Sequence, residues 1–194
     1  VYWWSLPVLA LFFAFVIALG AWEWASLTEL RHGVARVIYV ALVLAGAAAL
    51  YVYTGFNSVV APDRVQQVVG AGCLWWCLAL LCVRAYPGMA SLWSSRIVRG
   101  CMGLAILLPA WLAALFLLQV EGRGAAMVVM VLIVAAADIG AYFTGRALGK
   151  HALSPRVSPG KTWEGLWGGV VSVAAASVVL WSLLPPRVAH LSLP

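Results

Sequence analysis

Long apolar runs separated by short polar connections dominate the pattern of this chain. Six runs stand out, each with about the length of a helix that crosses a bilayer. They span roughly Trp3–Ala21, Val34–Phe56, Val65–Val83, Cys101–Val120, Ala125–Thr144 and Leu166–Leu184. Lipid offers the backbone no hydrogen-bond partners, so such segments are expected to be α-helices. The pattern therefore predicts an all-α fold class, a polytopic integral membrane helical bundle with about six transmembrane helices.

The composition favours a membrane protein over a soluble one. Of the 194 residues, 65% are hydrophobic and 9% are charged, whereas a soluble domain carries roughly a quarter charged residues. Apolar side chains this abundant cannot all be buried in one small core, so the excess is expected to face lipid. No change of composition marks a second domain. We therefore expect residues 1–194 to form a single transmembrane domain. We expect this domain to be incomplete at both ends, because the chain opens on Val1 rather than on methionine and stops in a short tail after Pro185 and Pro186.

Arginine and lysine are distributed unevenly over the connections between the runs. The first, third and fifth connections carry nine of them, namely Arg31, Arg36, Arg84, Arg96, Arg99, Arg146, Lys150, Arg156 and Lys161. The second and fourth connections and the tail carry three, namely Arg64, Arg123 and Arg187. The positive-inside rule predicts that the first, third and fifth connections are cytoplasmic. The same distribution accounts for most of the net charge of +6, so no nucleic-acid partner is expected.

Asp138 lies well inside the fifth apolar run, where an ionisable side chain is costly. Such a residue indicates a functional site, and the alternative is a structural partner for an arginine on a neighbouring helix. Helical spacing puts Tyr142, Gly145 and Gly149 near the face of Asp138. The two glycines would let either a ligand or another helix approach that face closely.

A basic connection follows this run. Its charged residues are four cations and one carboxylate: Arg146, Lys150, Arg156, Lys161 and Glu164. Several cations together suit a polyphosphate, whose negative charge is spread over many oxygens. The hydroxyls of Ser158 and Thr162 and the backbone amides around Gly160 would add neutral donors at the start of the sixth helix. The alternative is a basic loop that only sets the topology.

Other phosphate and metal sites are not supported. Gly160-Lys161-Thr162 resembles the end of a P-loop, but Pro155 stands where that motif requires glycine. The cysteines and histidines show no spacing typical of metal ligands: Cys73, Cys77, Cys82 and Cys101, and His32, His151 and His190. We expect the cysteines to be small apolar packing residues and the histidines to be polar loop residues.

Between Asp138 and Gly169 the sequence resembles the phosphatidate cytidylyltransferase family, also called CDP-diacylglycerol synthases. The resemblance is carried by Asp138, Ala141-Tyr142, Gly145-Arg146, Gly149-Lys150, Leu153, Pro155, the run VSPGKTWEG from Val157 to Gly165, and Gly168-Gly169. Weaker similarity covers Tyr86-Pro87-Gly88 and Ala21-Trp22-Glu23-Trp24. The resemblance implies that CTP and phosphatidic acid react to CDP-diacylglycerol and pyrophosphate in phospholipid biosynthesis. It also implies Mg²⁺ or another divalent cation, a homodimer, and a location in the bilayer of the bacterial inner membrane.

The resemblance also suggests roles for individual residues of what would then be a catalytic domain. Asp138 is expected to bind the metal and, with Lys161, to be catalytic. Substrate contacts are expected from Tyr142, Arg146, Lys150, Ser158, Gly160 and Thr162, of which Arg146 and Lys150 would bind phosphate. The family's most diagnostic segment, rich in lysine, aspartate and His-Gly-Gly, would follow Pro194. Residues 1–194 alone are therefore expected to be inactive.

Three other functions remain open. A transporter or channel subunit would explain an intramembrane acid, although it would usually show repeats or paired broken helices, which the sequence lacks. A non-catalytic membrane scaffold would not need four cations gathered beside an SPGKT turn. Another CTP-using lipid enzyme, such as a polyprenol kinase, would share the nucleotide and part of the site.

Overall fold

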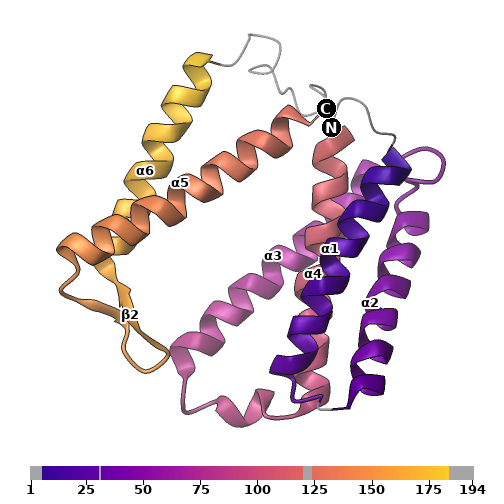
Figure 1. Cartoon of the computed structure of the whole chain (residues 1–194), viewed down its shortest axis with the longest axis horizontal. Coiled ribbons are helices and arrows are strands. Elements are labelled where there is room, and N and C mark those ends of the chain that lie inside the picture. The colour runs from indigo at the N-terminus through magenta and orange to yellow at the C-terminus, as the bar shows by residue number, and fades with distance from the viewer. Residues whose placement is uncertain (1–5, 31, 120–123, 184–194) are drawn as a thin grey trace. The chain divides into compact units, whose positions relative to one another are not determined.

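A computed structural model describes residues 6–30, 32–119 and 124–183 of the chain. In chain order, the elements in these ranges are α1 (Leu6–Leu27), α2 (Gly33–Tyr53), α3 (Pro62–Ala85), the short 3₁₀ helix η1 (Ala90–Trp93), α4 (Arg96–Gln119), α5 (Ala125–Leu148), β1 (Ala152–Ser154), β2 (Ser158–Thr162) and α6 (Trp163–Leu183) (Figure 1). The six α-helices are all long and apolar enough to cross a membrane. The predicted all-α fold class with six membrane-spanning helices is confirmed.

Several helices continue beyond the apolar runs that predicted them. Helix α1 ends at Leu27 rather than Ala21, and α5 ends at Leu148 rather than Thr144. Hydropathy marks the part of a helix that suits hydrocarbon, whereas the helix itself can continue into the polar interface. The expected limits Trp3, Val120 and Leu184 lie outside the described residues.

The chain divides into two compact units, Val1–Phe116 and Leu117–Pro194. In the first unit α1 packs against α2, and the buried side chains come mainly from α1, α2 and α4. Leu112 and Leu115 of α4 are fully buried there. Large apolar side chains lie exposed on all six α-helices, for example Leu11, Val37, Leu74, Ile97, Val131 and Val171. Such surfaces are suited to lipid rather than to water.

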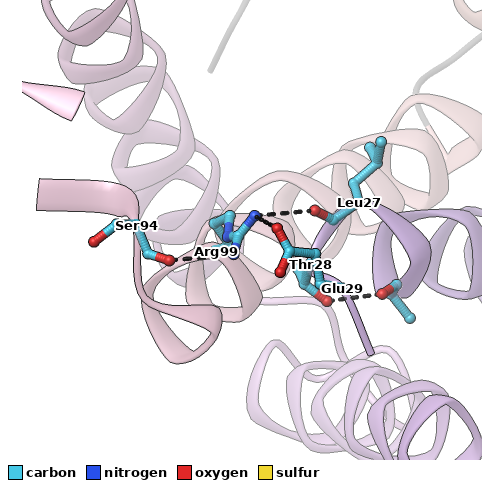
Figure 2. A network of polar contacts seen from close by, with 6 residues as sticks. Leu27, Thr28, Glu29, Ser94 and Arg99 are labelled. Atoms are coloured by element: carbon cyan, nitrogen blue, oxygen red, sulfur yellow. Dashed lines mark hydrogen bonds and ion pairs between the residues drawn. The ribbon is translucent and has the colours of Figure 1, made fainter. Parts of the chain in front are cut away.

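A network of polar contacts centred on Arg99 joins the end of α1 to the start of α4 (Figure 2). The guanidinium donates to the carbonyl oxygens of Ser94 at 3.1 Å and Leu27 at 3.5 Å. It also lies 3.2 Å from Oε1 of Glu29. The Trp24 indole donates in turn to the Arg99 carbonyl at 2.8 Å. The contact with Leu27 provides a partner for a carbonyl group at the C-terminal end of α1, which has none within its own helix.

The same end of the first unit also includes the start of α2. The hydroxyl of Tyr39 on α2 donates to the carbonyl of Gly100 on α4 at 2.9 Å. The connection after α1 and the connection before α4 therefore lie at one end of this unit. Helices that alternate in direction across a membrane require this arrangement.

In the second unit α5 and α6 lie side by side, and the β1–β2 hairpin joins them (Figure 1). The two helices approach closely because glycines form their interface. A β-carbon on Gly165 would lie 2.9 Å from the carbonyl oxygen of Ala141 and 3.2 Å from the Cα of Gly145. One on Gly169 would lie 3.1 Å from the carbonyl oxygen of Ala137. Small residues allow such close helix packing in membranes.

The hairpin was not expected from the sequence, which predicted a loop between the fifth and sixth helices. Strands β1 and β2 pair antiparallel, with Ala152 opposite Thr162 and Ser154 opposite Ser158. The strands are short, and Pro159 with Gly160 interrupts any alternation of apolar and polar residues in β2. Without that alternation, the segment gives no period-two signal.

The cysteines differ in part from their predicted role. All four are free thiols, on α3 and α4. Cys73, Cys77 and Cys101 are exposed on the helix surfaces, so the prediction that they are packing residues is wrong for these three. A free thiol behaves as a small apolar group, so the lipid-facing surface of a membrane helix tolerates it as well as a core does.

Candidate functional site

A cleft of about 900 Å³ lies in the second unit, between α5, the hairpin and the start of α6. Seven of the predicted site residues line it: Asp138, Tyr142, Arg146, Ser158, Gly160, Lys161 and Thr162. Apolar side chains such as Leu153 and Leu166 complete the wall. The structure thus brings together a carboxylate, two cations and three hydroxyls that come from two elements, α5 and β2.

The α5 side of the cleft carries Asp138, Tyr142 and Arg146, one helical turn apart on the same face. Nη1 of Arg146 donates a 2.9 Å hydrogen bond to the Tyr142 hydroxyl. This bond orients the guanidinium and leaves its other N–H groups available, because arginine carries five donors.

Asp138 is an exposed carboxylate of the cleft wall in the middle of α5. Within the described part of the chain it forms no ion pair, since the salt bridges there join Arg99 to Glu29 and His151 to Glu164. The alternative of a structural partner for a neighbouring arginine therefore gains no support from these residues. A carboxylate at this depth is suited to a bound cation.

The hairpin side of the cleft carries Ser158, Gly160 and Lys161, all on β2. Among the described residues, no heavy atom lies within 4 Å of the position that a Gly160 β-carbon would take. The protein's own packing therefore does not require glycine there, and the backbone is open to a ligand. The neighbouring Lys161 is exposed, so its ammonium group is free to move into contact with a bound anion.

Thr162 has a structural role as well as its predicted one. Its hydroxyl oxygen accepts a 3.1 Å hydrogen bond from the Gly165 amide, so it is the N-cap of α6. A hydroxyl that accepts one bond can still donate its proton. Donation to a ligand in the cleft is therefore compatible with the cap.

The two glycines at the end of α5 lie close to the start of α6. A β-carbon on Gly149 would lie 2.9 Å from the Thr162 side chain, and one on Gly145 would lie 3.3 Å from it. The sequence left open whether a ligand or another helix approaches these glycines. The structure shows close approach of the start of α6 at both, and Gly145 also lines the cleft, where a ligand can approach it.

Lys150 is the one predicted site residue outside the cleft lining of the described chain. Its backbone amide donates to Oε2 of Glu164 at 3.1 Å. From the sequence, Glu164 was only the single carboxylate of a basic loop, with no predicted role. An acid in the first turn of a helix can be recognised in a sequence as favourable for the helix dipole. The hydrogen-bond partners of Glu164, however, are Lys150 and His151, which lie 14 and 13 residues away in the sequence.

The cleft offers a metal ion few protein ligands among the described residues. Within the described residues, no group of three or more potential metal ligands occurs, and Asp138 is the one carboxylate that lines the cleft. Mg²⁺ is often held by one or two carboxylates together with substrate phosphates and water. The residues present therefore fit an ion that binds together with a nucleotide.

Comparisons with known proteins point to one family. Residues 1–193 match the sequence profile described as the cytidylyltransferase family. The chain is 42% identical over 161 residues to a phosphatidate cytidylyltransferase of Pseudomonas aeruginosa, covering 83% of this chain and 56% of that protein. It is 34% identical over 185 residues to a protein of the same name from Haemophilus influenzae, covering 86% of this chain and 64% of that protein.

A shorter match shows higher identity. A phosphatidate cytidylyltransferase of Brucella suis is 51% identical over 47 residues, which is 24% of this chain and 17% of that protein. No solved structure shows significant similarity to the chain. The chain spans 56% and 64% of the length of its Pseudomonas and Haemophilus relatives.

The profile match over almost the whole chain, the two long relatives and the six membrane-spanning helices agree with one another. The chain is a multi-pass membrane protein that belongs to the cytidylyltransferase family.

Proposed function

We propose that the protein transfers CMP from CTP to phosphatidic acid, which yields CDP-diacylglycerol and pyrophosphate in phospholipid biosynthesis. The observation that carries the proposal is the cleft, whose lining combines Asp138, in the middle of a membrane-spanning helix, with the cations Arg146 and Lys161. A charged nucleotide and a lipid phosphate can both reach such a position. The names of the two long relatives support this choice of substrates.

In this reaction the protein mainly has to neutralise phosphate charge and align the two substrates, and it takes little part in covalent chemistry. An oxygen of the lipid phosphate attacks the α-phosphorus of CTP, and the bond to the β-phosphate breaks. Negative charge then grows on the leaving pyrophosphate. Lys161 and Arg146 would stabilise that charge, and the Tyr142 hydroxyl holds the guanidinium in the cleft. Ser158, Thr162 and the backbone at Gly160 would supply neutral donors.

A divalent cation, Mg²⁺ or a similar ion, is part of the proposal. Asp138 would hold it, with the remaining positions filled by nucleotide phosphate and water. When bound, such an ion neutralises phosphate charge and orients the reacting groups.

We further propose that the cleft opens to the cytoplasm of a bacterial inner membrane and that the protein is a homodimer. The excess of arginine and lysine in the first, third and fifth connections supports the orientation. The contact between the first and third connections, through Arg99 and Glu29, is consistent with their lying on the same side. The proposal of a homodimer is supported by the family resemblance.

The position of the transferred phosphorus tests the proposal. The complete protein in lipid is given phosphatidic acid and CTP labelled either at the α-phosphate or at the γ-phosphate. Nucleotidyl transfer moves the α-label into lipid and releases pyrophosphate. Movement of the γ-label into a lipid, with release of CDP, would identify a kinase instead, and retention of both labels in CTP would contradict either transfer.

Variants of two cations in the hairpin region provide a matched control. Lys161→Ala removes a cation of the cleft and is expected to reduce α-label transfer at least about tenfold. Arg156 lies in the exposed turn of the hairpin, outside the cleft lining, so Arg156→Ala should retain transfer. Equal effects of the two changes would show that general charge, and not the cleft, binds the nucleotide.

A further inference from the structure

The carboxylate of Glu164 connects two segments that lie far apart in the sequence. Glu164 is in the first turn of α6. Its Oε2 accepts hydrogen bonds from the backbone amides of Lys150 at 3.1 Å and His151 at 3.3 Å. Its Oε1 lies 2.6 Å from Nδ1 of the His151 ring. A carboxylate only accepts, so that ring nitrogen carries the proton.

His151 is held at three points by the start of α6. In addition to the ring and amide contacts with Glu164, its carbonyl accepts a 3.0 Å hydrogen bond from the Trp163 amide. The next residue pairs with β2, because Ala152 lies opposite Thr162. The base of the hairpin is therefore fixed to α6 immediately after the end of α5.

The base of the hairpin lies between the two walls of the cleft. One wall is α5 with Asp138 and Arg146, and the other is β2 with Lys161. The two walls are joined through the segment from Gly149 to His151, which Glu164 holds. Glu164 itself is not among the residues that line the cleft. A change in its contacts would alter the spacing of the walls without removing a group that touches the substrate.

We propose that Glu164 is a positioning residue for nucleotide binding, which keeps Lys161 at the right distance from Arg146 to bind one polyphosphate. The inference rests on the proposed function, since it concerns the same cleft. It assigns Glu164 no direct contact with substrate and no part in proton transfer.

The chemistry of the side chain explains why a carboxylate suits this position. Two oxygens can accept from two adjacent backbone amides and a ring N–H at the same time. Glutamine has one carbonyl oxygen, and its NH₂ group would face one of these donors. Aspartate is one methylene shorter and would not span the same distance. We therefore expect a graded response, with glutamine less harmful than alanine.

A simpler possibility is that Glu164 only complements the positive end of the α6 dipole. Asp63 provides a control, because it is also an acid in the first turn of a long helix, α3. A loss that arises only from the helix dipole should be similar for Asp63→Ala and Glu164→Ala. A positioning role should appear with Glu164 alone.

The experiment compares Glu164→Ala, Glu164→Gln, His151→Ala and Asp63→Ala in the complete protein. The dissociation constant of CTP is measured without lipid, and KM and kcat are measured for both substrates. For Glu164→Ala we expect CTP binding to weaken about tenfold or more, while the KM for phosphatidic acid changes less than about threefold. Glu164→Gln should be intermediate, and Asp63→Ala should match the unmodified protein.

His151→Ala removes only the ring contact and should have the smaller effect. Combined with Glu164→Ala it should add little, because both changes break the same connection. Unchanged CTP binding in Glu164→Ala, or an equal loss in Asp63→Ala, would overturn the inference. An unmodified protein that does not bind CTP would instead overturn the proposed function. If Glu164→Ala does not fold, Glu164→Gln decides, and normal CTP binding there would also overturn the inference.

Discussion

Asp138 is the residue whose sequence position and structural surroundings give the sharpest expectation. It lies in the middle of an apolar helix, yet its carboxylate is exposed in the cleft. Asp138→Asn keeps the shape of the side chain and removes its charge. In the complete protein we expect turnover to fall at least about a hundredfold, on the order of 3 kcal/mol in the barrier. The melting temperature should stay nearly constant, because no ion pair with a described residue is broken.

Activity and melting temperature of this variant should be measured together, with and without Mg²⁺. A carboxylate that holds the metal predicts a folded, inactive protein that no longer responds to the ion. If Asp138 instead paired with a buried cation, asparagine would strand that charge and destabilise the protein by roughly 3–5 kcal/mol. Unfolding of the variant, or full activity, would remove Asp138 from the proposed site.

The N-cap hydrogen bond of Thr162 gives a prediction about stability. Thr162→Ala removes the acceptor of the Gly165 amide at the start of α6. This loss should cost about 1 kcal/mol in the free energy of unfolding. Thr162→Ser keeps the hydroxyl and is the matched control. Thermal unfolding of both variants in the same detergent checks the prediction, and equal melting temperatures would contradict a capping role.

Single residues were predictable where their chemistry conflicts with their surroundings. A carboxylate in an apolar run and several cations in one short connection are visible in the sequence, so Asp138, Arg146 and Lys161 were predicted as site residues, and the structure places all three on the cleft. Glu164 was missed because its role depends on partners that only the hairpin brings close. Lys150 was predicted to bind phosphate from its charge and from the family resemblance, and neither tells whether its side chain lines the cleft.

At the scale of elements, the α5–α6 contact gives a prediction about packing. Gly165→Ala would add a carbon 2.9 Å from the Ala141 carbonyl oxygen and force the two helices apart. We expect destabilisation of roughly 1–3 kcal/mol and a loss of activity, because the same helices form the cleft. Chemical unfolding and CTP turnover of the variant measure the two effects.

A second glycine provides the control for this change. Gly70 lies within α3, and among the described residues no heavy atom lies within 4 Å of its β-carbon position. Gly70→Ala should therefore be neutral or stabilise by up to about 1 kcal/mol through helix propensity. Similar losses in both variants would show that the close contact at Gly165 does not determine stability.

The six helices could be predicted because the bilayer determines their length and apolar composition. Each of the six helices needs enough apolar residues to cross the hydrocarbon layer, and that requirement is visible as a run. The last turn of α5, from Gly145 to Leu148, and the hairpin lie outside that requirement. Their conformation depends on contacts such as the one between Gly149 and Thr162, which no local pattern encodes.

At the scale of the whole chain, the number of spans followed from the sequence, but their packing did not. Helices that are apolar around most of their circumference do not distinguish a core face from a lipid face. Leu112 and Leu115 are fully buried while Leu11 and Val37 are exposed, although all four lie in similar apolar runs. Shape complementarity between helices determines which apolar side chains are buried, and this complementarity cannot be read from composition.

The side of the membrane on which the cleft opens remains a prediction of the charge distribution. It can be tested by labelling single cysteines in intact cells after the four native ones, Cys73, Cys77, Cys82 and Cys101, have been replaced by alanine. Three exposed connection residues are suitable: Ser58 between α2 and α3, Ser95 before α4, and Val157 in the hairpin.

If the excess of basic residues marks the cytoplasm, a membrane-impermeant maleimide should label Ser58→Cys from outside. Ser95→Cys and Val157→Cys should react only after the cells are permeabilised, which also shows that both thiols are accessible. Labelling of Val157→Cys in intact cells would put the cleft on the outer face, away from cytosolic CTP, and would contradict both the orientation and the proposed reaction.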